Sequence, residues 1–228
     1  MDEERDDVGA RAAIGGRRSV RRFLDLPVAD DTLRRILELS ARAASGGNLQ
    51  PWQVHVVRGA ALKRMSEAVL AVHETGAECP DYRYYPEVWR EPYLSRRRKV
   101  GFDLYARLGI TREDKAGRAE QFRQNFRFFG APVGIFVVIE RDFVPAGFLD
   151  SGLFLGNLAI AARSFGLETC LQAAWVYYGA VVRRELGLGD DHLVVAAAAL
   201  GHADPTAPEN EAFTERAPID EFTVFHES

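Results

Sequence analysis

Residues 131–165 read APVGIFVVIERDFVPAGFLDSGLFLGNLAIAARSF and place a strand-like run before a long helical pattern. The run from Pro132 to Ile139 has the length and the β-branched content of a buried strand. The stretch from Ala146 to Phe165 is largely apolar, as expected of a helix in the centre of a protein or at an interface. Two glycines four residues apart, Gly152 and Gly156, would let another helix approach it closely.

Shorter elements flank this pair on both sides. Apolar residues spaced as on one face of a helix predict a helix from Leu33, capped by Asp30 or Asp31, that ends near 45–48. Further strands are expected over 53–57, 168–172 and 192–200, and further helices from about 60, over 94–108, over 111–129 with Thr111 and Asp114 resembling a capping box, and over 180–186. A helix-rich chain with a few strands in this order predicts an α+β fold.

The composition is that of an ordinary globular protein. The formal net charge of −4 over 228 residues gives no general attraction to nucleic acid or to an anionic membrane. The acidic start has no apolar stretch and is not a secretory signal, and no apolar run approaches the roughly 18 residues that span a bilayer. Cys79 and Cys170 lack metal-ligand spacing, so we expect no metal site, a reducing compartment and a cytoplasmic protein.

One domain over 13–228 is expected behind a flexible, charged leader of residues 1–12. The tail, 205–228, contains prolines and alternating apolar residues, and it has little surface of its own to bury. We therefore predict an extended C-terminal arm that packs along another surface, such as a partner subunit.

Residues 76–93 form an irregular stretch rich in proline and aromatic residues, too long for a plain connection. We predict that the region 80–129 is a lid or substrate loop. Its tyrosines, Trp89, Phe126, Phe128 and Phe129 could stack on an aromatic substrate, or they could belong to the core.

The segment Arg17-Arg18-Ser19-Val20-Arg21-Arg22-Phe23 places four guanidinium groups within six residues. Arginine forks match phosphate oxygens with paired, charge-assisted hydrogen bonds, and the serine hydroxyl adds a donor. The segment therefore indicates a phosphate site; a solvated basic turn is the alternative.

A second motif, Ser45-Gly46-Gly47-Asn48-Leu49-Gln50-Pro51-Trp52, joins amide side chains, free backbone donors and a rigid proline. Such a turn can offer hydrogen bonds to the edge of a flat heterocycle. An ordinary helix-to-strand loop with a buried tryptophan is the alternative.

Together, in this order and at this separation, the two motifs resemble the nitroreductase family. Three further stretches agree with that family over residues 14–225: Gly166-Leu167-Glu168-Thr169-Cys170, Leu200-Gly201-His202-Ala203-Asp204, and Asn210 followed by Thr214-Glu215-Arg216-Ala217-Pro218-Ile219-Asp220-Glu221-Phe222. The loop rich in proline and aromatic residues and the arginine-rich stretch 96–98 are most similar to the branch of nitrobenzoate reductases.

The resemblance implies a nitroreductase-like fold: a central, mostly antiparallel sheet flanked by helices, in an intertwined homodimer with two FMN molecules at the interface. The residues implied to bind FMN are Arg17, Arg18 and Ser19 at the phosphate and ribityl chain, Arg21 at the N1–C2=O edge, Ser45, Gly46, Gly47 and Asn48 from the partner subunit, Gln172, Ala173 and Ala174 near N5, and Arg216 at the phosphate.

The activity implied is ping-pong hydride transfer through flavin N5, from NADH or NADPH to a nitroaromatic or quinone-like small molecule. We identify no protein side chain as a certain acid or base. Reductive dehalogenation, ene reduction or flavin breakdown on the same fold are alternatives. A non-catalytic flavin-binding protein is another, because Leu171 and Ala173 stand where relatives commonly have proline and glutamate.

Overall fold

The computed structural model describes residues 9–226. In these residues one antiparallel sheet has the strand order β1-β2-β4-β3. Its strands are β1 Gln53–Arg58, β2 Val133–Glu140, β3 Glu168–Gln172 and β4 His192–Gly201. The α+β class and the antiparallel sheet expected from the sequence are confirmed.

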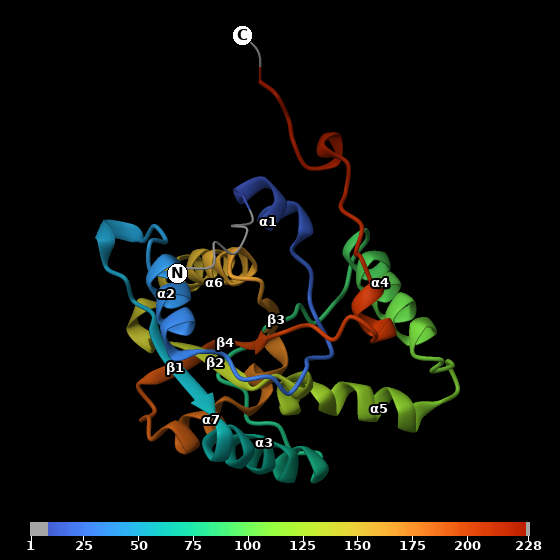
Figure 1. Ribbon diagram of the computed structural model, residues 1–228, viewed down its shortest axis with the longest axis horizontal. Coiled ribbons are helices and arrows are strands. Elements are labelled where there is room, and N and C mark those ends of the chain that lie inside the picture. Colours follow the sequence, from blue (N-terminus) through green and yellow to red (C-terminus); the bar gives the residue numbers. More distant parts are fainter. Residues whose placement is uncertain (1–8, 227–228) are drawn as a thin grey trace, which may run out of the picture.

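Helices cover both faces of the sheet (Figure 1). The helices are α1 Ala10–Gly16, α2 Asp30–Ser40, α3 Gly59–Glu74, α4 Tyr93–Arg107, α5 Lys115–Arg123, α6 Ala146–Ser164 and α7 Gly179–Leu186. Helices α2 and α6 pack on one face, and α3 and α7 on the other. Helices α4 and α5 project to one side of this three-layer body.

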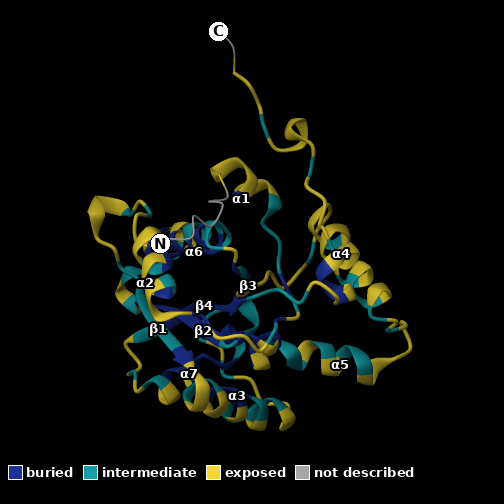
Figure 2. Ribbon diagram, in the orientation of Figure 1, coloured by how far each residue is buried: buried dark blue, intermediate teal, exposed yellow. Residues whose placement is uncertain are grey.

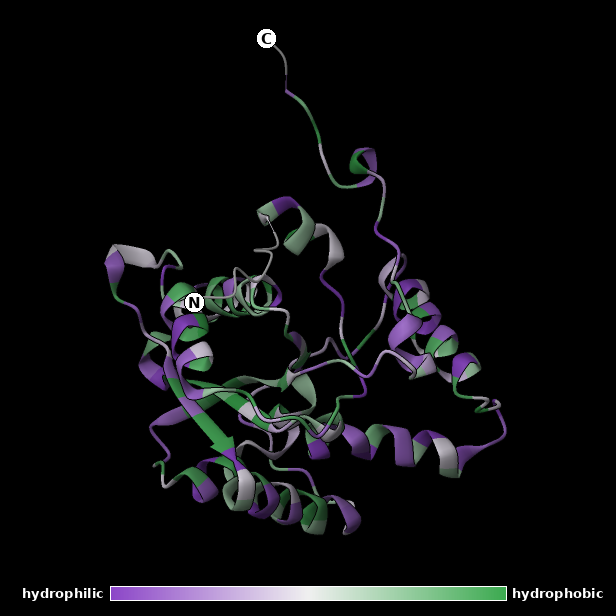
Figure 3. Cartoon of the chain, viewed as in Figure 1, coloured by the Kyte–Doolittle hydropathy of each residue, from purple (hydrophilic) through white to green (hydrophobic). Residues whose placement is uncertain are grey.

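The strand-like run expected over 132–139 forms β2, one of the two central strands of the sheet. Its odd-numbered residues, such as Ile135 and Val137, pack towards α6, whereas Phe136 and Val138 pack towards α3. Successive side chains of a strand point to opposite faces, so a strand covered on both faces is apolar throughout. Figure 2 shows the central strands buried, and Figure 3 shows α4 and α5 as largely hydrophilic.

The neighbouring strand β4 has a bulge at Val195, where its register against β2 shifts. The two residues at the bulge bind the loop that joins α3 to α4, residues 75–92, which we call the aromatic loop. The Tyr82 hydroxyl donates to the carbonyl of Val195 at 2.7 Å, and the Val194 N–H donates to the Asp81 carboxylate at 2.9 Å. The bulge therefore attaches the first part of the aromatic loop to the sheet.

Both capping expectations were wrong. Helix α2 starts at Asp30 and has no side-chain cap, because the Asp30 carboxylate accepts from Arg58 at 2.6 Å instead. The helix also ends at Ser40, well before residues 45–48. Helix α5 is capped by Asp114, which accepts from the Gly117 N–H at 2.8 Å. Thr111 lies outside that helix and caps nothing.

The segment expected as one helix over 111–129 divides into α5 and the 3₁₀ segment η2, Gln124–Gly130. Phe126, Phe128 and Phe129 are buried in η2, and the Phe128 ring stacks on Trp175 at 4.6 Å between centroids. Of the two alternatives left open for these phenylalanines, substrate stacking or the core, the structure supports the core.

The two ends of the chain also differ from expectation. Helix α1 begins at Ala10, so residues 10–12 of the expected leader are helical; residues 1–8 lie outside the described part. The tail is not extended throughout, because it forms 3₁₀ segments η5 Pro208–Glu211 and η6 Ile219–Glu221. No helix within residues 9–226 is long and apolar enough to cross a membrane.

Ion pairs hold the tail against α4 as far as Glu221. Glu211 pairs with Arg107 at 3.2 Å, and Glu221 pairs with Arg96 at 2.8 Å. Figure 1 shows the last part of the tail, from before η6 onwards, standing away from the body, with Phe222 70% exposed and Phe225 71% exposed.

Candidate cofactor-binding site

The arginine-rich segment that follows α1 is held in place by backbone contacts. The Val20 N–H donates to the carbonyl of Thr169 in β3 at 3.0 Å. Buried Asn210 accepts from the Arg21 N–H at 2.8 Å and donates to the carbonyl of Arg22 at 2.7 Å. Backbone groups of this segment are thus paired with β3 and with the tail, and Arg22 pairs with Glu209 at 3.4 Å.

Two of its guanidinium groups lack an opposite charge of their own. Burial, and next the charge of Arg216, lower the pKa of Arg17 below its usual value. Buried Nε of Arg18 has no hydrogen-bond partner in the described residues. An anion bound here would reduce the repulsion between these like charges and would accept a hydrogen bond from the unpaired donor.

A matched pair lies beside this cluster. Arg163 at the end of α6 pairs with Glu168 at the start of β3. Burial raises the pKa of Glu168, although the charge of Arg163 opposes the shift. Glu168 also lies near Arg17 and Arg18, so it compensates part of their charge. Arg163 was missed in the sequence because its place beside the segment depends on how α6 packs.

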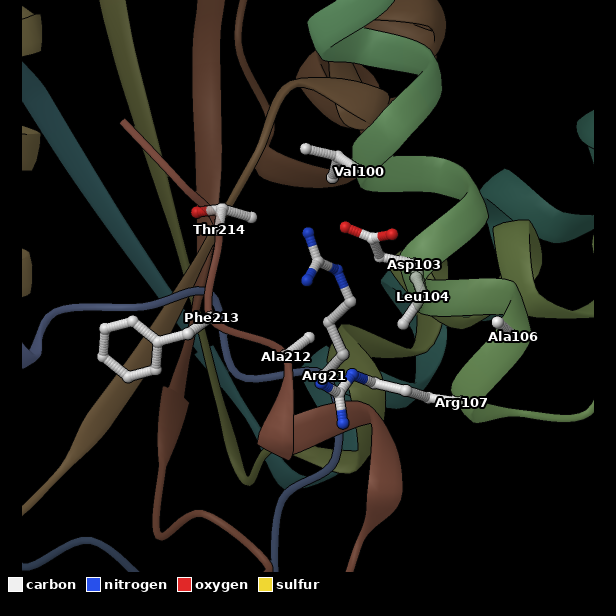
Figure 4. Close-up of a pocket in the computed structure, with 9 residues that line it drawn as sticks. All are labelled: Arg21, Val100, Asp103, Leu104, Ala106, Arg107, Ala212, Phe213 and Thr214. Atoms are coloured by element: carbon white, nitrogen blue, oxygen red, sulfur yellow. The ribbon is translucent and has the colours of Figure 1, made fainter. Parts of the chain in front are cut away.

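A cavity of about 390 Å³ opens next to the segment, between α4 and the tail (Figure 4). Its lining residues are Arg21, Val100, Asp103, Leu104, Ala106, Arg107, Ala212, Phe213 and Thr214. The guanidinium of Arg21 points into it, towards Asp103 on α4. Apolar walls with two cations, Arg21 and Arg107, and the carboxylate of Asp103 suit a flat molecule with a polar or anionic edge.

The arginine cluster and the cavity adjoin each other. The guanidinium of Arg18 lies over the ring of Phe213, 5.9 Å from its centroid, and Phe213 lines the cavity. A neighbouring hollow of about 270 Å³ includes Arg216 and shares Thr214 with the first. Anion-binding groups therefore lie at one end of a cavity that has room for a ring system. The sequence did not indicate the α4 residues that line it, although Val100, Leu104 and Arg107 share one face of that helix.

The second sequence motif lies elsewhere in the chain. Ser45 precedes the 3₁₀ segment η1, Gly46–Asn48, in which Gly47 and Asn48 have φ of +56° and +58°. The Gly46 N–H donates to Asp150 of α6 at 3.3 Å. In Figure 1 this light-blue segment is separated from α4 by the body of the protein. One chain therefore does not bring Ser45, Gly46, Gly47 and Asn48 to the cavity beside Arg21.

The third predicted group lies where β3 ends. Buried Gln172 donates from Nε2 to the carbonyl of Asn125 at 2.7 Å, and its Oε1 has no partner in the described residues. Ala173 and Ala174 begin the 3₁₀ segment η4, Ala173–Tyr178, and are partly buried. This turn follows the same strand that holds the arginine segment.

Known proteins resemble this chain over nearly its whole length. The model described as the Nitroreductase family matches residues 14–202. Nitrobenzene nitroreductase of Ectopseudomonas oleovorans is 38% identical over 214 residues, which cover 93% of this chain and 94% of that protein. A 4-nitrobenzoate reductase of Nocardioides sp. (strain LMS-CY) is 36% identical over 218 residues, 94% of this chain and 88% of that protein.

A solved structure agrees closely with the fold. The FMN and NADPH-dependent nitroreductase NfnB from Sphigopyxis sp. strain HMH superimposes with a TM-score of 0.94 and 44% sequence identity. The match covers 96% of this chain and 100% of that one. The nitroreductase-like fold expected from the sequence is thereby confirmed.

Proposed function

This chain belongs to the nitroreductase family, and we propose that it is an FMN-dependent NAD(P)H oxidoreductase that reduces nitroaromatic compounds. The observation that supports this most is the arginine cluster of Arg17, Arg18 and Arg216, which adjoins a cavity with Arg21 at its centre. The names of its relatives point to the same cofactor and substrate class.

The donor set fits the phosphate of FMN. Arg17, Arg18 and Arg216 offer guanidinium forks, Ser19 offers a hydroxyl, and the orphaned Nε of Arg18 is a donor that an anion would satisfy. When bound, FMN supplies the redox chemistry, namely the ring that accepts and passes on hydride.

The remaining residues would position the flavin ring and polarise it. Arg21 would hold a fixed positive charge inside the cavity, where a preorganised cation favours negative charge on the bound ring. The walls made by Leu104 and Phe213 would exclude water on one side. Gln172, Ala173 and Ala174 would present backbone N–H groups rather than an acid or base. The region 80–129 would form the acceptor side as a lid, except for η2.

A homodimer would complete the site. Helix α6 exposes Leu149 at 69% and Leu153 at 43%, and a Cβ built on Gly152 between them would meet nothing within 4 Å outside its neighbouring residues and the backbone of α6 itself. Apolar residues exposed together in this way mark an interface. Across a two-fold axis, Ser45–Asn48 of one protomer would reach the cavity of its partner, and the apolar end of the arm would be covered.

The two cysteines are free, with Cys170 buried and Cys79 partly exposed. This agrees with the reducing compartment expected from the sequence, and we propose a cytoplasmic location.

The decisive experiment is an absorption spectrum of the purified protein before and after anaerobic addition of NADPH, and in parallel NADH. We expect oxidised-flavin bands, release of FMN on denaturation, bleaching by a reduced nicotinamide, and recovery of the bands on adding nitrobenzene. A flavin that neither coenzyme bleaches would favour the non-catalytic alternative. A colourless protein that takes up no added FMN would refute the proposal.

Oligomeric state is tested separately by light scattering after size exclusion. A mass near twice 25.4 kDa is expected, and Leu153→Glu should lower it. A monomeric wild-type protein that still binds FMN with full affinity would refute the proposed contribution of the partner.

A further inference from the structure

Arg97 is an exposed residue of α4, one turn before the part of that helix that lines the cavity. It precedes Val100 by three residues and Leu104 by seven on α4, so the three side chains share one face of that helix. Since Val100 and Leu104 line the cavity, Arg97 extends the same face by one turn towards the start of α4.

The guanidinium of Arg97 is held by two rings of the aromatic loop. It lies over Trp89 at 4.8 Å and over Tyr85 at 5.7 Å from the ring centroids. The two rings also contact each other, with centroids 5.2 Å apart. Stacking occupies the faces of a guanidinium and leaves the N–H donors around its edge free.

Nothing in the described residues uses those donors. Within 9–226, no ion pair or side-chain hydrogen bond involves Arg97, whereas Arg96 pairs with Glu221 and Lys99 pairs with Asp103. A cation oriented by aromatic rings and left without a carboxylate is prepared for an anionic ligand with planar geometry.

The same group of residues borders the turn that begins with Ala173 and Ala174. Burial raises the pKa of Tyr177 in η4, with further effects of Tyr85 and Glu78 in the same direction and of Arg97 in the opposite one, so the charges of Glu78 and Arg97 both act on this hydroxyl. The backbone agrees, because the Cys79 N–H donates to the carbonyl of Tyr177 at 2.9 Å. The aromatic loop, whose rings hold Arg97, therefore lies against η4.

The first part of the aromatic loop is fixed, which gives this arrangement a firm base. The side chain of Asp81 is 2% exposed and pairs with Arg141 at 2.7 Å and Arg183 at 3.2 Å, in addition to the Val194 N–H. A Cβ on Gly179 would meet the Asp81 carboxylate at 2.4 Å, so that glycine leaves the space Asp81 occupies.

We propose that Arg97, stacked on Tyr85 and Trp89, selects electron acceptors that carry a carboxylate on an aromatic ring, such as nitrobenzoates. The carboxylate would take the free edge of the guanidinium in a bidentate pair, while the ring of the acceptor packs against the aromatic loop. This rests on the proposed function and names the substrate class of the same site.

The test compares 4-nitrobenzoate with its neutral isostere 4-nitrobenzamide, using holoenzyme and saturating NADPH. For Arg97→Gln we expect kcat/KM for the benzoate to fall about tenfold to hundredfold, the usual effect of losing a charge-assisted pair, with the benzamide changed by less than about threefold. The matched control is Arg98→Gln, which removes the same charge from the next position on α4 and should leave the ratio between the two substrates unchanged.

Two kinetic results would overturn the assignment. One is a wild-type enzyme with no preference for the benzoate. The other is an Arg97→Gln variant that loses both substrates equally or raises the KM for NADPH, which would place a coenzyme phosphate on Arg97.

A binding titration separates this proposal from the proposed function. Quenching of tryptophan fluorescence by 4-nitrobenzoate should weaken about tenfold or more in Arg97→Gln, whether or not the protein turns over. If the wild-type protein reduced neither compound but Arg97→Gln still bound 4-nitrobenzoate more weakly, the nitroreductase function would be refuted. The carboxylate site would nevertheless be supported. Equal binding to both proteins would refute the site.

Discussion

Arg141 and Arg183 surround a buried carboxylate, whereas Arg17 lies within the influence of a second cation, Arg216. In the first group both guanidinium groups reach Asp81, and Arg183 also reaches Asp190 at 2.6 Å. In the second, the charge of Arg216 opposes that of Arg17. The protein therefore contains arginines of two kinds: those whose charge is matched by carboxylates, and those whose charge is largely unmatched.

The difference separates two uses of arginine. A matched group removes the cost of burying charge and joins segments far apart in the sequence, here the aromatic loop to α7 and β4. A group with too few counter-charges adds little to the stability of the free protein and keeps donors for a ligand, although Nη1 of Arg216 already donates to Thr214 and to the carbonyl of Glu215. Substitutions should therefore affect folding at one site and binding at the other.

The largest effect is expected at the matched group. Asp81→Ala would leave buried Arg183 paired only with the exposed Asp190 and would remove the partner of Arg141, and we expect the free energy of unfolding to fall by about 3–5 kcal/mol. Chemical denaturation of the FMN-free protein measures this change.

The control for that prediction is the double variant Asp81→Ala with Arg183→Met, which removes both charges. It should recover part of the loss, because an apolar side chain replaces the uncompensated cation. A single variant as stable as the wild type would show that Asp81 is not an anchor.

The next effect is at the unmatched group. Arg17→Gln removes one charge-assisted contact to the proposed phosphate, worth about 1.5–3 kcal/mol, so the Kd for FMN should rise about tenfold to hundredfold. The unfolding free energy of the FMN-free protein should stay the same or increase, since repulsion from Arg216 is relieved.

Fluorescence titration and denaturation of the same preparation test both halves of this prediction. Inorganic phosphate serves as an additional probe, and it should stabilise the FMN-free wild type more than the variant. Clear destabilisation of the FMN-free variant with unchanged FMN affinity would reverse the assignment of the two groups.

Local signals in the sequence were sufficient for several elements. The apolar run of β2 and the apolar stretch of α6 depend only on neighbours in the chain, and both elements lie within a residue of their predicted ends. The density of arginine over residues 17–22 also identified the segment that now adjoins the cavity. In each case the determining residues are contiguous.

Long-range packing could not be predicted in the same way. Phe126 and Phe128 suited a lid as well as a core, and only the position of Trp175 decides between the two. Asp81 reaches partners more than fifty positions away. Asp30 was expected to cap a helix, but the arrival of Arg58 from β1 offered its carboxylate a stronger partner.

A smaller effect, on the pH dependence of stability, is expected at Glu168, which pairs with Arg163 and lies near Arg17 and Arg18. The sign of this effect is what makes it informative. Burial raises its pKa in the folded protein. The folded state therefore holds the proton more tightly than the unfolded state, and this contribution to stability is present at low pH and lost as pH rises through the folded pKa. Compared with Glu168→Gln, the FMN-free wild type should lose stability as pH increases from about 4 to 8.

Denaturation curves of the two proteins across that range give the comparison directly. Glu168→Gln also loses the ion pair with Arg163, which lowers its unfolding free energy by a roughly constant amount. The titration of Glu168 is therefore read from how the difference in unfolding free energy between the two proteins changes with pH. A difference that does not vary with pH would mean that burial leaves this carboxyl unperturbed.

The smallest effect is expected where charge is matched but not buried. Lys63 and Glu67 lie 3.8 Å apart on α3 with side chains 76% and 63% exposed. Water already solvates both, so Glu67→Gln should change the free energy of unfolding by less than about 0.5 kcal/mol, and less still in high salt. Comparing the unfolding free energies of Glu67→Gln and Asp81→Ala separates the effect of pairing two opposite charges from the effect of burying them. If Glu67→Gln lowered the free energy of unfolding as much as Asp81→Ala, pairing opposite charges would stabilise this protein even without burial. The small contribution to stability expected of Arg17 and Arg216 would then be due to their shortage of counter-charges and not to their burial.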